Sequence, residues 1–342
     1  MSEVLAPTLT AASNLARPRL GFLGVGWIGR QRMEAMLATG AVEAAAVFDP
    51  AADQCEAALA LAPGAERPGS LEELLALDLD GLVIATPSAL HAEQAVMALD
   101  RGVAVFCQKP LGRTAREAAA VVDAARGADR LLGVDLSYRF TEGMQRIRDL
   151  IRAGVLGQVF AADLTFHNAY GPDKAWFYDP ALSGGGCVLD LGVHLVDLAL
   201  WTLDFPEVSA VESVLLAGGK PLAGRTDAVE DYATATVQLA SGTVVRLACS
   251  WRLHTGADAE ISASFHGTKG GAALRNVDGS FYDFTAARFE GSRREVLAGP
   301  PDAWGGRAAA DWARRLAAGE RFDPACEHLV DAQRVLDRIY GR

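Results

Sequence analysis

Arg19-Leu-Gly-Phe-Leu-Gly-Val-Gly-Trp-Ile-Gly29 is the stretch that decides the fold of this 342-residue chain. Its apolar start, 19–24, predicts a strand, and the amphipathic residues 27–38 predict a helix. The glycines between them form the pattern G-x-G-x-x-G. The first permits a tight turn, the second lets the backbone approach a pyrophosphate, and the third lets helix and strand pack closely. Because a helix N-terminus offers free N–H groups to phosphate, we expect a dinucleotide site formed by Gly24, Gly26, Trp27, Ile28 and Gly29.

The rest of the first half repeats this alternation of strand and helix. Ser70 with Glu73, and Thr114 with Glu117, have the spacing of capping boxes that begin helices. Apolar strands that alternate with helices indicate a parallel sheet covered on both faces, which is the doubly wound Rossmann plan. Further strands are predicted at 42–49, 81–86, 103–107 and 131–136, and further helices at 51–62 and 88–101.

The residues that close these strands are informative, because ligands of such a sheet bind beyond the carboxyl ends of its strands. Asp49 lies 20 residues after Gly29, where a carboxylate can accept hydrogen bonds from ribose hydroxyls and repel a 2′-phosphate. We therefore expect NAD rather than NADP, although Asp49-Pro50 is also a sequence that simply begins a turn. The strand-closing residues are Gly24, Asp49, Thr86, Lys109 and Tyr138.

The second half of the chain has a different pattern, which indicates a sheet built from hairpins. Helices are expected again at 303–318 and 324–340, and we expect both to pack back against the first half. We divide the chain into a tail (1–18), a Rossmann domain (19–138), an α+β domain (139–324) and a C-terminal helix (325–342). The strands of the second half are expected at 158–166, 207–216, 229–240, 243–253, 258–266 and 271–276.

Three side chains are candidates for catalysis. Lys109 follows the apolar strand 103–107, and Pro110 favours an extended backbone at Lys109. Residues 187–201 predict an apolar helix on which Asp190, His194 and Asp197 share one face, and burying such a polar face is costly unless it has a task.

Imidazole is suited to proton exchange near neutral pH. We expect His194 to be the acid/base, Lys109 to polarise the same oxygen, and Asp190 to orient the substrate or His194. A core histidine satisfied by its neighbours is one alternative. A metal site formed with Asp197 is another, but no further His or Cys cluster supports it, and we predict no metal.

Five segments, taken together and in order, resemble the glucose–fructose oxidoreductase and inositol dehydrogenase (Gfo/Idh/MocA) family. The resemblance extends from about residue 18 onward and implies a C-terminal domain with a large, open, mostly antiparallel sheet. It also implies that Lys109, Asp190 and His194 form the active site. The segments are the glycine loop, Thr86-Pro-Ser-Ala-Leu-His91, Gln108-Lys-Pro110, Gly184-Gly-Gly-Cys-Val-Leu-Asp-Leu-Gly-Val-His194 and Glu230-Asp-Tyr232.

The resemblance extends the predicted site but also contains one departure. The family usually has Glu where this chain has Gln108, which removes a carboxylate beside the nicotinamide end of the site. His91 is expected along the cofactor path, although a histidine at a helix start is also common on the surface. Residues 170–178 supply aromatic rings that can stack on a sugar or cover a hydrophobic edge. We expect cofactor contacts from Asp49, Thr86, Pro87, His91, Gln108 and Lys109, and substrate contacts from Lys109, Tyr138, Tyr170, Trp176, Asp190 and His194.

Composition excludes several other classes of protein. A formal net charge of −11 and a pI of about 5.1 disfavour nucleic-acid binding. The five cysteines include no C-x-x-C pair, so we expect reduced thiols in a cytoplasmic protein. Residues 1–18 do not resemble a secretory signal, and no apolar run approaches the roughly 20 residues that cross a bilayer. One free face of the second sheet, together with the family resemblance, predicts a homo-oligomer, dimer or tetramer.

The leading functional hypothesis is an NAD-dependent oxidoreductase that moves a hydride between the nicotinamide and a secondary alcohol or ketone of a sugar, cyclitol or related polyol. A second hypothesis is an enzyme that retains its NAD and uses transient oxidation for elimination or glycoside cleavage. A third is a dinucleotide-bound regulator without catalysis, which the presence of Lys109 and His194 disfavours.

Overall fold

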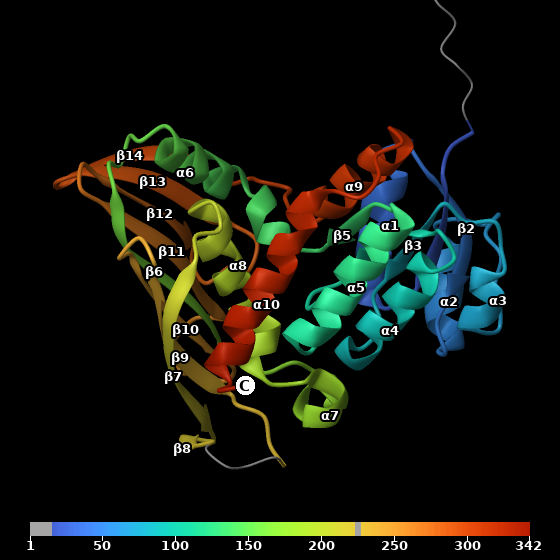
Figure 1. Ribbon diagram of the computed structural model, residues 1–342, viewed down its shortest axis with the longest axis horizontal. Coiled ribbons are helices and arrows are strands. Elements are labelled where there is room, and N and C mark those ends of the chain that lie inside the picture. Colours follow the sequence, from blue (N-terminus) through green and yellow to red (C-terminus); the bar gives the residue numbers. More distant parts are fainter. Residues whose placement is uncertain (1–15, 223–226) are drawn as a thin grey trace, which may run out of the picture.

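The structure is a computed structural model of the chain and describes residues 16–222 and 227–342. Residues 1–15 of the predicted tail (1–18) therefore lie outside the described residues. Figure 1 shows two lobes, a smaller sheet wrapped by helices and a larger open sheet, with the C-terminal helix α10 (Glu327–Ile339) between them. The predicted fold class is confirmed.

The smaller sheet has five parallel strands in the order β2-β1-β3-β4-β5. A parallel bridge between Ala46 and Glu66 extends the β2 edge by one residue pair, at the place of a further strand. Strand β2 lies on one side of β1 and strand β3 on the other, so the direction of the strand order reverses at β1. Ligands of such folds bind at this switch point, which lies beside Gly24. The strands are β1 (Arg19–Leu23), β2 (Glu43–Phe48), β3 (Gly81–Ile84), β4 (Ala104–Cys107) and β5 (Leu132–Val134).

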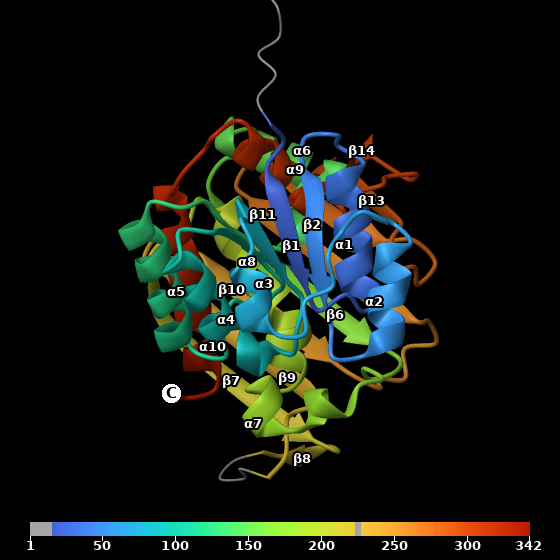
Figure 2. The same cartoon turned by 90° about the vertical axis from the view of Figure 1, so that its right-hand side faces the viewer.

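Helices cover both faces of this sheet, as Figure 2 shows. Both predicted N-caps are present, because the Ser70 and Thr114 hydroxyls accept hydrogen bonds from the backbone N–H groups of Glu73 and Glu117, each at 3.2 Å. The two glutamate side chains accept hydrogen bonds from the N–H groups of the residues just before these N-caps. Each face has its own hydrophobic cluster of buried side chains. The helices are α1 (Trp27–Leu37), α2 (Ala52–Leu59), α3 (Leu71–Leu75), α4 (Ser88–Leu99) and α5 (Ala115–Ala128).

The larger sheet has nine strands in the order β14-β13-β12-β11-β6-β10-β9-β7-β8. Neighbouring strands are antiparallel except for β6 and β10, which pair in parallel. This is the large, open, mostly antiparallel sheet that the resemblance implied. Its strands are β6 (Val159–Asn168), β7 (Val208–Ala217), β8 (Lys220–Pro221), β9 (Tyr232–Leu239), β10 (Val244–Ser250), β11 (Ala259–Gly267), β12 (Gly271–Asn276), β13 (Phe284–Glu290) and β14 (Arg293–Ala298).

The helices of the second half connect the two sheets. Helix α6 (Glu142–Arg152) and helix α8 (Val193–Thr202) lie on the inner face of the large sheet, and every residue of α8 is buried. Helix α9 (Arg307–Ala317) packs on α1, and α10 packs on both α5 and α8. The proposed domain division at 138 and 324 assigns α9 to the second unit, although its main contact is α1 of the first. A short helix, α7 (Pro180–Ser183), precedes α8.

The helical stretch Pro180–Thr202 is, by length and composition alone, apolar enough to cross a membrane, which the sequence analysis did not expect. In the fold, 78% of its most apolar part is buried inside the protein. The stretch therefore acts as the core helix of the second half.

Candidate active site

One cleft of about 1160 Å³ lies between the two sheets and brings most of the predicted site residues together. Gly24 and Gly29 do not line the cleft. They lie on the inner side of the glycine loop, and Gly26, Trp27 and Ile28 of this loop border the cleft. The predicted residues that line the cleft are Gly26, Trp27, Ile28, Asp49, Thr86, Pro87, His91, Gln108, Lys109, Tyr138, Tyr170, Trp176, Asp190 and His194.

The glycine loop fits a pyrophosphate. Gly24 has a φ of +79°, and a Cβ there would lie 2.6 Å from the carbonyl oxygen of Ala85 on β3's loop. A Cβ on Gly29 would lie 2.1 Å from the Gly24 oxygen, so helix and strand can meet only with glycine at both positions. Gly26 has open space above it, and no side chain caps the first N–H groups of α1. Those N–H groups are therefore available to phosphate.

Asp49 holds the loop together and retains acceptor capacity. Its Oδ2 accepts a hydrogen bond from the Val25 N–H and its Oδ1 accepts one from the Ala51 N–H, both at 2.9 Å. Each carboxylate oxygen can accept a second bond. The predicted contact with ribose hydroxyls is therefore compatible with the bonds that Asp49 already makes.

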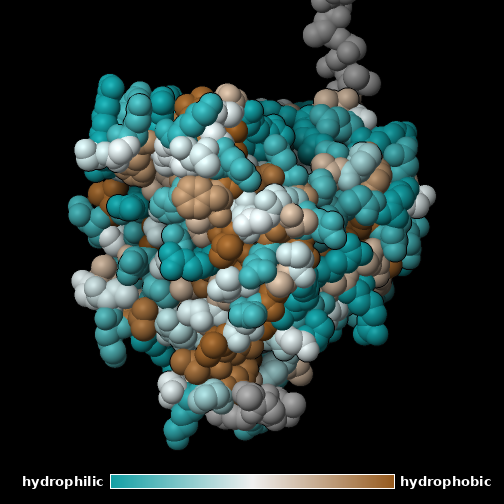
Figure 3. All heavy atoms as spheres, turned by 60° about the vertical axis from the view of Figure 1, so that its left-hand side comes forward, coloured by the Kyte–Doolittle hydropathy of each residue, from teal (hydrophilic) through white to brown (hydrophobic). Residues whose placement is uncertain are grey.

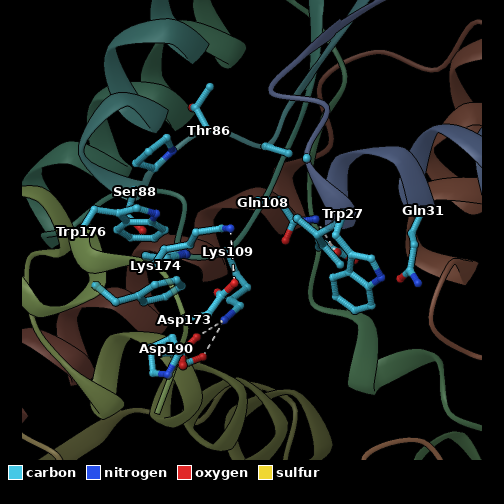
Figure 4. A pocket seen from close by; sticks show the side chains of 18 of the residues that line it. Trp27, Gln31, Thr86, Ser88, Gln108, Lys109, Asp173, Lys174, Trp176 and Asp190 are labelled. Carbon is cyan, nitrogen blue, oxygen red and sulfur yellow. Dashed lines mark hydrogen bonds and ion pairs between the residues drawn. The ribbon is translucent and has the colours of Figure 1, made fainter. Parts of the chain in front are cut away.

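On the other side of the cleft Lys109 and Asp190 are hydrogen-bonded to each other (Figure 4), and Trp251 bonds to Asp190 from outside the cleft lining. The Lys109 ammonium donates to Asp190 Oδ1 at 2.8 Å and to the Asp190 carbonyl oxygen at 2.7 Å. The Trp251 indole N–H donates to Asp190 Oδ2 at 3.0 Å. Both carboxylate oxygens are thereby fixed, and the ammonium, which has three donors, keeps one for a ligand.

The backbone around Asp190 is a single turn of π-helix, Val188–Gly192, that leads into α8. The Val193 N–H bonds to the Val188 carbonyl five residues earlier. Within this turn the Asp190 carbonyl oxygen accepts a hydrogen bond from the Lys109 ammonium. Such turns often occur at functional sites.

Glu230 holds the start of that turn. Its side chain is fully buried, and its Oε1 accepts hydrogen bonds from the N–H groups of Gly186 and Val188, both at 2.9 Å, and from the Tyr340 hydroxyl at 2.7 Å. Burial raises the pKa of the Glu230 carboxyl. The conspicuous Glu230-Asp-Tyr232 segment of the sequence thus supports the site from behind.

His194 lies at the start of α8 with its ring packed edge-on against Tyr138, at 4.8 Å between ring centroids. Burial lowers the pKa of His194 well below its usual value, and the charges of Lys109 and Arg32 lower it further. No described residue makes a hydrogen bond to this ring, and His194 lines the cleft. A neutral imidazole facing a ligand cleft can accept a proton.

Asp197 does not belong to this group, contrary to the expectation that it shares a functional face with Asp190 and His194. The Asp197 carboxylate is buried, is ion-paired with Arg139 and does not line the cleft. Across residues 16–222 and 227–342, no group of three or more His, Cys, Asp or Glu is arranged to hold a metal ion.

His91 is buried rather than exposed at the helix surface. Its Nδ1 lies 2.7 Å from the Pro110 carbonyl oxygen and its Nε2 lies 2.7 Å from the Thr86 carbonyl oxygen. Burial lowers the pKa of His91 more than these two carbonyls raise it. The ring therefore ties the loop after β3 to the loop after β4, both of which border the cleft.

Aromatic side chains form the remaining walls of the cleft. Tyr138 packs against Trp304 as well as His194, with ring centroids 4.8 Å apart in each case. Tyr170 is 52% exposed, and its ring centroid lies 6.0 Å from that of Phe281. The Trp176 ring stacks on the ring of the next residue, Phe177. These rings present flat apolar surfaces to whatever enters between them.

Several residues at the site were not identified from the sequence. Asp135 follows β5, and its Oδ2 accepts hydrogen bonds from the Arg32 Nε and the Gln108 Nε2, both at 2.6 Å. The rule that strand-closing residues bind ligands would have found Asp135, since it is the last residue but one of the predicted strand 131–136. Asn168 ends β6 and Trp251 follows β10. They carry no such signal, because the hairpin pattern of the second half does not reveal that these two strands pair in parallel.

Family models match two successive parts of the chain. Residues 19–136 match the oxidoreductase family described as an NAD-binding Rossmann fold, and residues 144–273 match the Gfo/Idh/MocA C-terminal domain. The N-terminal match covers the predicted cofactor-binding segment.

Curated relatives point to the same family. The oxidoreductase subunit assigned to UDP-kanosamine synthase in Amycolatopsis mediterranei (strain S699) is 32% identical over 75% of each chain. The D-glucoside 3-dehydrogenase of Escherichia coli (strain K12) is 31% identical over 59% of this chain and 60% of that protein. With it and three other relatives, the chain spans only 54% to 61% of their length.

Solved structures share the whole fold. Levoglucosan dehydrogenase in complex with NADH and levoglucosan has a TM-score of 0.80 at 21% identity, with 95% of this chain and 96% of that chain covered. GenD2 from gentamicin A biosynthesis, in complex with NAD, has a TM-score of 0.79 at 22% identity over 99% and 97%. Sequence and fold agree, and the chain belongs to the Gfo/Idh/MocA family of oxidoreductases.

Proposed function

We propose that this chain is an NAD-dependent dehydrogenase or reductase that interconverts a secondary alcohol and a ketone on a sugar, cyclitol or related polyol. The observation that carries the proposal is the meeting, in one cleft, of the glycine loop with Lys109, Asp190 and His194. The names of relatives that act on glucosides, levoglucosan and inositol support this substrate class.

The cofactor fits the residues on its side of the cleft. Gly26 and the first N–H groups of α1 would hold the pyrophosphate, and Asp49 would hold the adenosine ribose, which favours NAD over NADP. Trp27, Ile28, Thr86, Pro87, His91 and Gln108 border the remaining length of the path. When bound, NAD supplies the hydride acceptor, and NADH the hydride donor, for the carbinol carbon.

The chain's own residues would manage the proton and the charge. In the direction of oxidation, neutral His194 accepts the hydroxyl proton, and the free N–H of the Lys109 ammonium stabilises the oxygen as negative charge develops on it. Asp190 fixes the ammonium through two hydrogen bonds, and Trp251 fixes Asp190. Tyr138, Tyr170 and Trp176 would pack on the apolar faces of the sugar ring.

A substrate panel tests this proposal. We expect one or more sugars, cyclitols or glycosides to give NADH from NAD, followed by near-ultraviolet absorbance, or the matching keto compounds to consume NADH. Turnover of a substrate without any net change in NADH would favour the alternative in which the cofactor is retained. Cofactor binding without turnover of any panel member would favour the regulator.

We also propose that the protein is a cytoplasmic homo-oligomer, a dimer or tetramer. Figure 3 views the outward side of the large sheet, where apolar and polar side chains are interspersed, and Phe160, Val214 and Val296 on that sheet are each more than half exposed. All five cysteines are buried free thiols, as suits a reducing compartment. Light scattering at several concentrations would give the oligomeric state.

A further inference from the structure

The floor of the cleft contains a buried group of three polar side chains, Arg32, Asp135 and Gln108, that the proposed mechanism does not use. Arg32 comes from α1, Gln108 follows β4 and Asp135 follows β5, and the side chains are 7%, 8% and 2% exposed. The Asp135 N–H also bonds to the carbonyl of Cys107, which keeps the ends of β4 and β5 together. All three side chains line the cleft.

The hydrogen bonds of Asp135 leave one strong acceptor free. Its Oδ2 takes both the Arg32 guanidinium and the Gln108 amide nitrogen, at 2.6 Å each. Its Oδ1 is buried and has no partner among the described residues. A buried carboxylate oxygen without a donor is costly, and a ligand that supplies a donor is one way to satisfy it.

Asp135 also determines how Gln108 is oriented. Because an ionised carboxylate only accepts hydrogen bonds, the Gln108 side chain must turn its NH₂ group toward Asp135. The amide oxygen of Gln108 then points away from Asp135 and is a second free acceptor at the cleft. A glutamate at position 108 would instead put two carboxylates in contact, which disfavours the ionised pair.

We propose that Arg32, Asp135 and Gln108 act as one unit that binds the nicotinamide end of the cofactor through these two acceptors, and that its charge balance sets the preference between the oxidised and reduced forms. The carboxamide NH₂ of the nicotinamide carries two N–H donors, one for each of these acceptors. The inference rests on the proposed cofactor site but not on the proposed substrate or on turnover.

The charge balance has a direct consequence. Asp135 neutralises Arg32, so the unit as a whole is neutral. If Asp135 were replaced by Asn, the uncompensated guanidinium would repel the cationic ring of NAD more than the neutral ring of NADH. The affinity for NAD should then fall more than the affinity for NADH.

The test exchanges the amide and the carboxylate between positions 108 and 135. The dissociation constants of NAD and NADH are measured by fluorescence in the absence of substrate. Gln108→Glu should weaken NADH binding roughly 10- to 100-fold, since it replaces a donor with a second anion, and should make the affinity depend on pH. The double variant Gln108→Glu with Asp135→Asn again has one carboxylate and one amide beside Arg32. It should recover NADH affinity to within about threefold of the parent.

Two outcomes would overturn the proposal: Gln108→Glu with parental affinity, or a double variant that binds no better than Gln108→Glu alone. Gln108→Leu is a further variant that leaves the Arg32–Asp135 pair intact and removes the amide oxygen. It should also lose affinity, and unchanged NADH binding in this variant would contradict the role of that oxygen. A chain that passes these binding tests but oxidises no sugar would refute the proposed function while leaving this inference standing.

Discussion

Replacing Lys109 with methionine removes the ammonium and keeps a side chain of similar length. Asp190 takes two of the three ammonium donors, at 2.8 and 2.7 Å, which leaves one for the substrate oxygen. A hydrogen bond from a charged group contributes about 1.5–3 kcal/mol, which corresponds to roughly 10- to 150-fold in rate if the bond forms mainly in the transition state. Losing the ammonium should also slow the proton transfer to His194, which adds to the effect of the lost hydrogen bond. We therefore expect kcat/KM to fall by roughly 10²–10⁴.

The assay compares NADH formation and NADH binding in the same preparations. Binding should change little, because the pyrophosphate and adenosine contacts come from the glycine loop and Asp49. The low-pH limb of kcat/KM should also move to higher pH, because the Lys109 charge is one of the causes that lower the pKa of His194.

Lys174→Met is a matched control for this experiment. Lys174 borders the same cleft but is 66% exposed and paired with Asp173, so its removal should leave kcat/KM within about threefold of the parent. A Lys109→Met enzyme that binds NADH normally and keeps kcat/KM within about threefold of the parent would refute the assignment of Lys109.

Other predictions concern the base, the cofactor and stability. His194→Ala should lower kcat by roughly 10²–10⁴ in steady-state assays with NADH affinity nearly unchanged, and near-parental turnover would exclude His194 as the base. Asp49→Ala should weaken NAD binding more than NADP binding in fluorescence titrations, and equal losses would contradict the ribose contact. Glu230→Ala should lower the free energy of unfolding in urea by about 1–3 kcal/mol for each donor it leaves unsatisfied, and Glu230→Gln by less. Because burial lowers the pKa of His194 in the folded state, its contribution to the free energy of unfolding should be complete above pH about 6.5 and decline below it, by up to about 1.4 kcal/mol per pH unit. Unfolding curves between pH 5 and 8 with no such decline would contradict the burial of His194 as a neutral group.

The sequence predicts the first half of the fold well because its signals are local. Each strand contains a continuous apolar run, and each of the two N-cap hydrogen bonds joins residues only three positions apart. The elements of the second half that were missed are helices α6 and α7, strand β8 and the hairpin of β13 and β14. In that hairpin the strand β14 is largely exposed and rich in charge, so no apolar alternation marks it. Its pairing with β13 comes from tertiary contact rather than from its own pattern.

The candidate site was predictable where it depends on single positions and unpredictable where it depends on partners. Lys109 and His194 follow from the strand end and the apolar helix, and the structure places both at the cleft. Asp197 pairs with Arg139, which lies 58 positions earlier in the chain, and helical spacing alone does not reveal this partner. Likewise the contact between Gln108 and Asp135 joins residues 27 positions apart and requires the order of the strands.

Deuterium transfer tests the central claim most directly, namely that a hydride passes between the nicotinamide and a ring carbon held at Lys109 and His194. NADH that carries deuterium at its transferable position would be incubated with the keto-sugar or keto-cyclitol that the panel identifies. We expect the product alcohol to hold one deuterium on its carbinol carbon, in amounts equal to the NADH consumed, and His194→Ala to make this product far more slowly. Product alcohol without deuterium, or formed without loss of NADH, would contradict direct hydride transfer at this site.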